Sequence, residues 1–152
     1  MGNSTHSLSS TQFSQSTLET TIGVSFRDQN LLYIALTHSS YLNEYTETSI
    51  ESNERLEFLG DALIGTIIAH EIYSRHPNWS EGTLTKARAR IVQGETLAII
   101  SDRISLGKYL VMGRGEEETG GRNKTGNLAG ALEALVGAIF IDQGYKKTCE
   151  FV

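Results

Sequence analysis

The chain has 152 residues, 39% of them hydrophobic and 20% charged, and its 18 acidic and 13 basic side chains give a net charge of −5. This length can bury one sizeable core, so we expect a single domain. The acidic balance argues against bulk attraction to nucleic acid or anionic lipid, but it allows a local basic patch or a site that uses bound cations.

No uninterrupted apolar stretch approaches the roughly 18–20 residues that a membrane-spanning helix needs. We therefore expect a soluble protein with no membrane partner. The single cysteine, Cys149, cannot form an internal disulfide, which favours a reducing, cytoplasmic location.

In chain order, residues 1–17 are rich in Ser, Thr and Gln and lack Lys and Arg, which predicts a disordered tail rather than a targeting signal. From Leu18 onward, apolar residues recur at spacings of three and four, which is typical of helices. The fold class should be all-α, with helices near residues 18–22, 28–37, 53–75, 81–105, 127–142 and 145–152. The segment 113–126 contains five glycines and mixed charges, so we expect a loop there.

The helix expected at 53–75 carries an acidic face. At about 100° per residue, Glu54, Glu57 and Asp61 fall within an arc of about 60°. We expect the core-facing stripe to consist of the apolar residues Leu56, Leu59, Leu63 and Ile67. The acidic face is either an ordinary solvated surface or part of a site. Phe58 lies beside the carboxylates, so it either packs under a neighbouring loop or enters a partner molecule.

The helix expected at 127–142 is apolar on every side except at Glu133, so it should lie at the centre of the fold. A buried glutamate must be paired, protonated, bound to a cation or hydrogen-bonded to a loop backbone. Gly130 and Gly137 flank Glu133 on the same face and would let the acidic helix approach closely. Together, Glu57, Asp61 and Glu133 offer the oxygen ligands that suit Mg²⁺, an ion commonly used in phosphodiester hydrolysis.

The segment NERLEFLGD at 53–61 closely resembles the signature of the ribonuclease III family. Segments 18–44, 80–98, 109–122 and 132–144 are similar to family segments in the same order, so the resemblance covers residues 18–152. It implies the all-α ribonuclease III nuclease domain, an endonuclease that cleaves double-stranded RNA and leaves 5′-phosphate and 3′-hydroxyl ends. It also implies Mg²⁺ as cofactor, with Mn²⁺ as a substitute, and a homodimer formed through the acidic signature helix.

By this resemblance, Glu57, Asp61 and Glu133 are metal ligands, and Asp61 and Glu133 are catalytic. Glu54 belongs to the same acidic cluster as an auxiliary residue. The aromatic residue that matches Phe58 inserts into the other subunit. Glu81 matches another acidic position of the family, although a charge at a helix N-terminus explains it equally well.

The chain departs from the family at Gly130, where the family normally has an Asp that completes the carboxylate set. A water or the amide oxygen of Asn127 could take its place. Gly130 also motivates an alternative function, a catalytically inactive ribonuclease III-like domain that binds RNA or a ribonucleoprotein as a scaffold.

A double-stranded-RNA-binding domain usually follows this nuclease domain, and no segment of the chain resembles one. The helix at 145–152 ends on an apolar pair, so we expect it to be truncated. RNA contacts would then come from local basic residues, although each of them is equally well explained as a solvated cation. The candidates are Lys86, Arg90, Arg114, Arg122 and Lys124.

Overall fold

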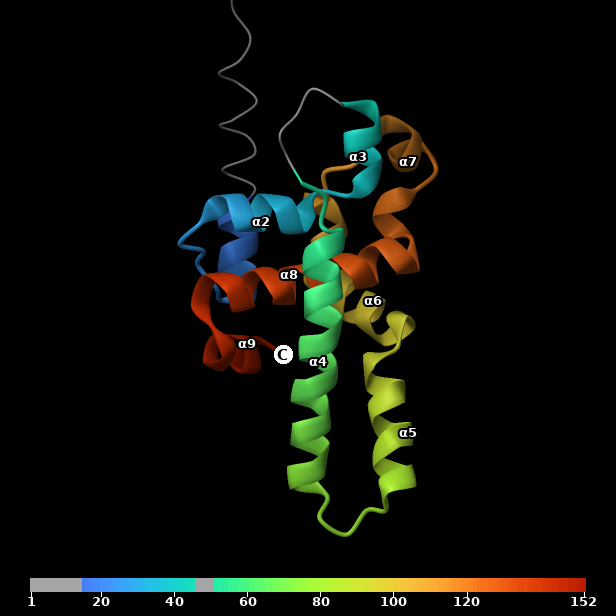
Figure 1. Cartoon of the computed structure of the whole chain (residues 1–152). Coiled ribbons are helices and arrows are strands. Elements are labelled where there is room, and N and C mark those ends of the chain that lie inside the picture. The colour runs from blue at the N-terminus through green and yellow to red at the C-terminus, as the bar shows by residue number, and fades with distance from the viewer. Residues whose placement is uncertain (1–14, 46–50) are drawn as a thin grey trace, which may run out of the picture.

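The computed structural model in Figure 1 describes residues 15–45 and 51–152. Within these ranges the chain is helical and has no strand, apart from an isolated parallel bridge between Thr37 and Val111. The expected all-α class is confirmed. The predicted tail at 1–14 lies outside the described residues, whereas residues 15–17 already belong to a helix over 15–22 that buries Gln15 and Leu18.

The remaining described helices are joined mostly by short connections. They are α2 (Gln29–Leu36), α3 (Ser39–Glu44), α4 (Glu54–Arg75), α5 (Glu81–Val92), α6 (Gly94–Arg103), η1 (Leu106–Tyr109), α7 (Arg114–Glu118), η2 (Gly121–Asn123), α8 (Thr125–Gln143) and α9 (Tyr145–Phe151).

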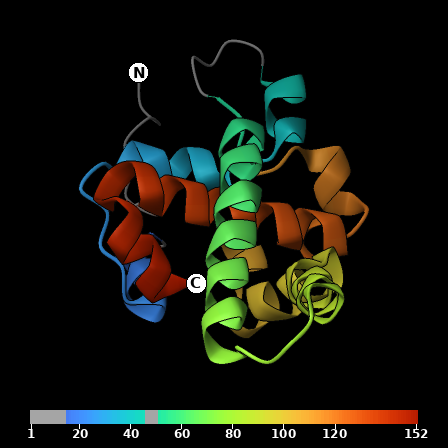
Figure 2. The ribbon, with the colours of Figure 1, turned by 60° about the horizontal axis from the view of Figure 1, so that its bottom comes forward.

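Helix α8 is the centre of the fold, as its apolar sequence predicts. It packs against α2, α4, α6 and α9, and Figure 2 shows it crossing beneath α4. By length and composition alone, α8 is long and apolar enough to cross a membrane, so the expectation that the chain has no such segment was wrong. However, 61% of the most apolar 18-residue stretch of α8 is buried inside the protein. This burial explains its composition as that of a core helix.

Glycines set the close crossing of α4 and α8. A Cβ atom added at Gly60 on α4 would collide with the backbone carbonyl of Glu133, and one added at Gly137 on α8 would collide with the carbonyl of Leu56. The small-residue strip expected around Glu133 is therefore the surface on which α4 lies. Gly60 is its counterpart on α4, and the sequence analysis did not identify it.

The helix expected over 81–105 is two helices. Gln93 has an extended backbone with ψ 149° and serves as the boundary between α5 and α6. The break lets α5 continue the hairpin that it forms with α4, which projects from the body in Figure 1, while α6 turns back onto α8.

The segment 113–126, expected to be a loop, contains α7 and η2. The cause is tertiary, because the Glu44 carboxylate at the end of α3 accepts hydrogen bonds from the backbone N–H groups of Arg114 (2.8 Å) and Gly115 (3.0 Å). These two donors belong to the first turn of α7 and would otherwise lack partners. The same bonds hold the pKa of Glu44 below its ordinary value.

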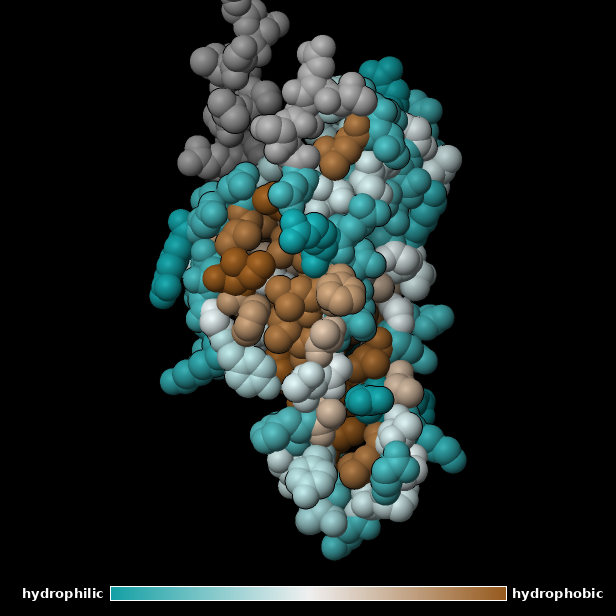
Figure 3. All heavy atoms as spheres, in the orientation of Figure 1, coloured by the Kyte–Doolittle hydropathy of each residue, from teal (hydrophilic) through white to brown (hydrophobic). Residues whose placement is uncertain are grey.

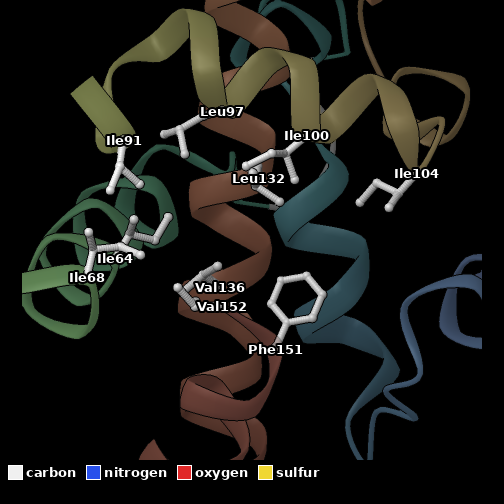
Figure 4. A pocket seen from close by; sticks show the side chains of 10 residues that line it. All are labelled: Ile64, Ile68, Ile91, Leu97, Ile100, Ile104, Leu132, Val136, Phe151 and Val152. Atoms are coloured by element: carbon white, nitrogen blue, oxygen red, sulfur yellow. The ribbon is translucent and has the colours of Figure 1, made fainter. Parts of the chain in front are cut away.

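Helices α4, α5, α6, α8 and α9 surround an apolar hollow of about 190 Å³. Figure 4 shows side chains from all five helices facing it, among them Ile64, Leu132 and Phe151. Its walls carry no charged group, so it contributes to packing and not to the acidic site.

Candidate active site

The start of α4 is tied to two other parts of the chain. Asn53, which directly precedes α4, donates its backbone N–H to the carbonyl of Thr37 (2.8 Å). His38, which follows Thr37 in the chain, donates its backbone N–H to the carbonyl of Val111 (2.8 Å). These bonds fix the position of the first turn of α4, the turn that carries Glu54 and Glu57.

The buried face of α4 differs from the stripe expected from sequence. Leu56 and Ile67 are buried as expected, but Leu59 and Leu63 are only half-buried, and Gly60 and Ile64 are buried instead. On a helical wheel this rotates the buried face by about 60° toward Glu57. Glu57 is consequently half-buried at the edge of the interface with α8, and not on a face that points away from the core.

The structure brings Glu57, Asp61 and Glu133 into one electrostatic cluster. Burial and the repulsion of Asp61 and Glu57 raise the pKa of Glu133 from 4.5 to about 7. Burial and the charges of Glu54 and Asp61 raise the pKa of Glu57, while the nearby imidazole of His38 lowers it. In the part of the chain that the structure describes, no ion pair or side-chain hydrogen bond compensates these three carboxylates.

Gly130 lies directly under the Glu57 carboxylate. A Cβ atom added at Gly130 would be 2.7 Å from Oε2 of Glu57 and 2.9 Å from its Cδ. The side chain of Glu57 therefore uses space that any larger residue at position 130 would claim.

A polar hollow of about 200 Å³ opens beside Gly130. It is lined by His38, Ser39, Asn53, Glu54, Glu57, Gly126, Asn127 and Gly130. The amide of Asn127 is oriented by two bonds of its Nδ2, to Oε1 of Glu116 (2.7 Å) and to the carbonyl of Gly121 (2.9 Å). Both donor hydrogens are thus used by neighbouring groups, and its Oδ1 remains an available acceptor.

The other acidic residues lie around this cluster or far from it. Glu54 is exposed one turn before Glu57 and accepts a hydrogen bond from Ser52 Oγ (2.8 Å). Asp61 borders a second, open hollow between α4 and α5, together with Arg88. Glu81 begins α5 at the far end of the projecting hairpin, where its carboxylate accepts a bond from Thr85 Oγ1 (2.8 Å).

The chemistry of this donor set fits a hard divalent cation. Carboxylates are the ligands that Mg²⁺ prefers, and a cation placed beside Glu57 and Glu133 would offset the burial and like-charge repulsion that raise the pKa of these two groups. As the described side chains stand, no three acidic, imidazole or thiol groups are close enough together to share one ion. The three carboxylates could share a cation only if their side chains moved closer together, and the cation's charge would then offset their repulsion.

Phe58 projects into solvent, with 81% of its surface exposed. It borders a mainly apolar hollow of about 690 Å³ formed by α2, α4 and the end of α8, whose walls include Leu31, Ile34 and Ile141. Polar and charged residues at the start of α4 also line it, namely Glu51, Ser52, Glu54 and Arg55. Figure 3 shows apolar side chains gathered on this face of the molecule. A projecting ring and a hollow thus lie side by side on one surface.

Two of the basic candidates for RNA contact are used inside the chain. Arg122 forms an ion pair with Glu117 and donates to the carbonyls of Gly107 (2.9 Å) and Leu110 (2.8 Å). Lys124 pairs with Glu116 (2.9 Å). Both side chains therefore stabilise the segment around α7 and are poor candidates for binding phosphate.

His38 and Arg88 are neighbours of the acidic cluster that were not predicted from sequence. His38 carries one visible signal, a Ser two residues later, which is compatible with a helix-capping turn. Arg88 has no local signal of this kind, because the hollow that it shares with Asp61 depends on how α4 and α5 pack.

The chain is similar in sequence and in fold to known proteins. The model of the family described as ribonuclease-III-like matches residues 28–152. Ribonuclease 3 of Borreliella burgdorferi is 50% identical over 131 residues, which are 86% of this chain and 53% of that protein, and ribonuclease 3 of Bacillus licheniformis is 45% identical over the same shares. The chain spans about half the length of these curated relatives. Among solved structures, a nuclease domain of ribonuclease III from Campylobacter jejuni, in which a region involved in dimer formation is flexible, superposes with a TM-score of 0.82 at 36% identity, covering 89% of this chain and 90% of that one.

Proposed function

Because this chain belongs to the ribonuclease-III-like family, we propose that it is an endonuclease that hydrolyses double-stranded RNA with the help of Mg²⁺, for which Mn²⁺ can substitute. The proposed products carry 5′-phosphate and 3′-hydroxyl ends. We assign this activity to the domain formed by residues 18–152 and propose a cytoplasmic location.

One observation carries the proposal. The family signature on α4 and the glutamate of the core helix α8 meet as a single cluster of uncompensated carboxylates, in which the pKa of Glu133 reaches about 7. A half-buried charged group on a core helix is costly, and a chain of net charge −5 has no general attraction for RNA. A bound divalent cation offsets both disadvantages, because it neutralises the carboxylates and attracts the phosphate backbone.

In this proposal, each residue of the site has a role that depends on its position. Glu57, Asp61 and Glu133 would hold the cation between α4 and α8, and Glu54 adds negative potential at its rim. When bound, Mg²⁺ supplies activation of water and stabilisation of charge on the phosphoryl oxygens. Glu133 releases its proton when the cation binds, because the charged form of the carboxyl then gains a partner. Arg88 lines the same hollow as Asp61, and in this proposal it would contact a phosphate next to the cleaved bond.

We also propose a homodimer with two-fold symmetry. An exposed phenyl ring beside an apolar hollow on the same surface is self-complementary, since Phe58 of one subunit can enter the hollow of the other while the reverse contact forms. This would place two copies of the acidic cluster on one assembly, as cleavage of both RNA strands requires.

Incubation with long duplex RNA tests the proposed activity. The unmodified protein should cut the RNA with Mg²⁺ or Mn²⁺ and not with EDTA, and Asp61→Asn should abolish cutting. Asp102→Asn is a matched control, because Asp102 is an exposed aspartate on α6 whose loss should leave cleavage unchanged. RNA that stays intact with both ions would contradict the proposal.

The observation that favours a second function is Gly130. If the remaining carboxylates cannot hold the cation without a side chain at this position, the domain would bind RNA or a ribonucleoprotein without cutting it. Retention of RNA in a gel-shift experiment, without products under either ion, would support this scaffold role.

A further inference from the structure

The segment that leads into α3 carries an imidazole at the edge of the acidic cluster. Its backbone is held on both sides, since His38 donates to Val111 and the preceding Thr37 accepts from Asn53. Asn53 in turn accepts from the backbone N–H of Glu57 (2.8 Å). The ring of His38 is therefore fixed beside the first turn of α4, and it lines the same polar hollow as Glu57.

The hydrogen bonds of the ring determine which nitrogen carries the proton. Nδ1 accepts from the backbone N–H of Ser40 (3.2 Å) and lies 2.8 Å from Ser40 Oγ. Ser40 Oγ accepts from the backbone N–H of Gly113 (2.9 Å), so its own hydrogen is free to point at Nδ1. An Nδ1 that accepts hydrogen bonds is unprotonated, and the neutral ring therefore carries its proton on Nε2.

Nε2 has no hydrogen-bond partner among the described residues, and it is not buried, because no buried side-chain nitrogen or oxygen in this part of the chain lacks a partner. This N–H donor is therefore accessible, and its residue is one of those that line the polar hollow. The carboxylate of Glu57 borders the same hollow, extends over Gly130 and has no donor of its own. The free donor and the free acceptor therefore share one small polar space.

We propose that His38 is a positioning residue that acts on the site through Glu57. Its Nε2–H donates to the Glu57 carboxylate through a water in the hollow, and this bridge holds that carboxylate over Gly130 in the orientation that binds the divalent cation. Groups that orient the ligands of a metal typically change its affinity by 10- to 100-fold when they are removed. The proposal rests on the proposed function, since it assumes that Glu57 is a metal ligand.

A merely structural role for His38 would be to cap α3, and this role belongs to Nδ1 alone. Two substitutions separate the two nitrogens. His38→Asn places an amide oxygen near the position of Nδ1, so it keeps the cap and removes the donor in the hollow. His38→Gln places an amide N–H near the position of Nε2, so it keeps the donor and removes the cap.

Calorimetric titration with Mn²⁺ measures the effect without relying on activity. We expect His38→Asn to melt within about 2 °C of the unmodified protein and to bind Mn²⁺ at least tenfold more weakly. His38→Gln should melt at a lower temperature and retain Mn²⁺ affinity within about threefold. If His38 acted only as a helix cap, Mn²⁺ affinity would instead be lost in His38→Gln and kept in His38→Asn. That result would overturn the proposal.

An independent readout is the ¹⁵N chemical shift of the imidazole in the unmodified protein. We expect the protonated nitrogen of His38 to be Nε2, and a proton on Nδ1 would overturn the proposal. The outcomes also distinguish the two levels of inference. If the unmodified protein binds Mn²⁺ and cuts RNA while His38→Asn matches it in both, only the role of His38 is wrong; if the unmodified protein does neither, the proposed function fails and the role of His38 fails with it.

Discussion

Replacing Glu133 by Gln removes one charge from the acidic cluster with little change in shape, and it should stabilise the metal-free protein. In the folded state the pKa of this carboxyl is raised from 4.5 to about 7 by burial and by Asp61 and Glu57. Between these two values the folded protein binds more protons than the unfolded chain. Its stability therefore falls as pH rises through this window, and the whole cost is present above pH 7.

The shift corresponds to at most about 3 kcal/mol. Glu133 is only half-buried, so solvent screening reduces the expected cost to about 1–2 kcal/mol. Urea denaturation in EDTA should therefore show Glu133→Gln to be more stable than the unmodified protein by about that amount at pH 8, with the difference vanishing near pH 4.5. Added Mg²⁺ should stabilise the unmodified protein and leave the variant nearly unchanged.

The sign of the difference decides the matter. A variant that is less stable than the unmodified protein at pH 8, or a stability difference that does not change between pH 5 and 7, would mean that Glu133 already has a stabilising partner. The cluster would then not be the uncompensated set from which we argue for a cation.

Four further substitutions at three positions test other parts of the account. Gly130→Ala should displace the Glu57 carboxylate and weaken Mg²⁺ binding, since the new Cβ would be 2.7 Å from Oε2 of Glu57. Gly130→Asp makes the same close contact but adds an anionic oxygen, so Mg²⁺ should raise its melting temperature more than that of Gly130→Ala. Equal rises in the two variants would mean that position 130 does not face the cation. Phe58→Asp should convert a dimer into a monomer in sedimentation velocity at micromolar concentration, and an unmodified protein that is already monomeric would refute the interface. Gly60→Ala should lower the free energy of unfolding, measured by urea denaturation, by about 3 kcal/mol or more, because its Cβ meets the backbone carbonyl of Glu133 and forces α4 and α8 apart. A decrease below about 1 kcal/mol would show that the two helices cross less closely than described.

The two helices that carry the site could be predicted from sequence because each has a strong local pattern. The apolar run of α8 with one glutamate indicates a core helix, and the glycines beside Glu133 indicate where another helix can cross it. The acidic helix α4 was predicted to be that neighbour from its carboxylates, independently of the family signature.

The features that sequence missed depend on partners far along the chain. Helix α7 exists because Glu44, about 70 residues earlier, supplies its N-terminal hydrogen bonds. The rotation that half-buries Glu57 follows from the position of Gly60 against α8, which favours a buried face different from the one that leucines alone suggest. The orientation of His38 depends on Ser40 and Gly113, and no local periodicity encodes that pairing.

Calorimetric titration of Mn²⁺ into the unmodified protein and into Glu57→Gln, Asp61→Asn and Glu133→Gln tests the central claim most directly, with Asp102→Asn as the control for loss of an exposed negative charge. The account predicts that the unmodified protein and the control bind Mn²⁺ equally well, and that each of the three substitutions weakens binding at least tenfold. Equal affinity in all five proteins, or an equal loss in Asp102→Asn, would show that these carboxylates of α4 and α8 do not share a cation.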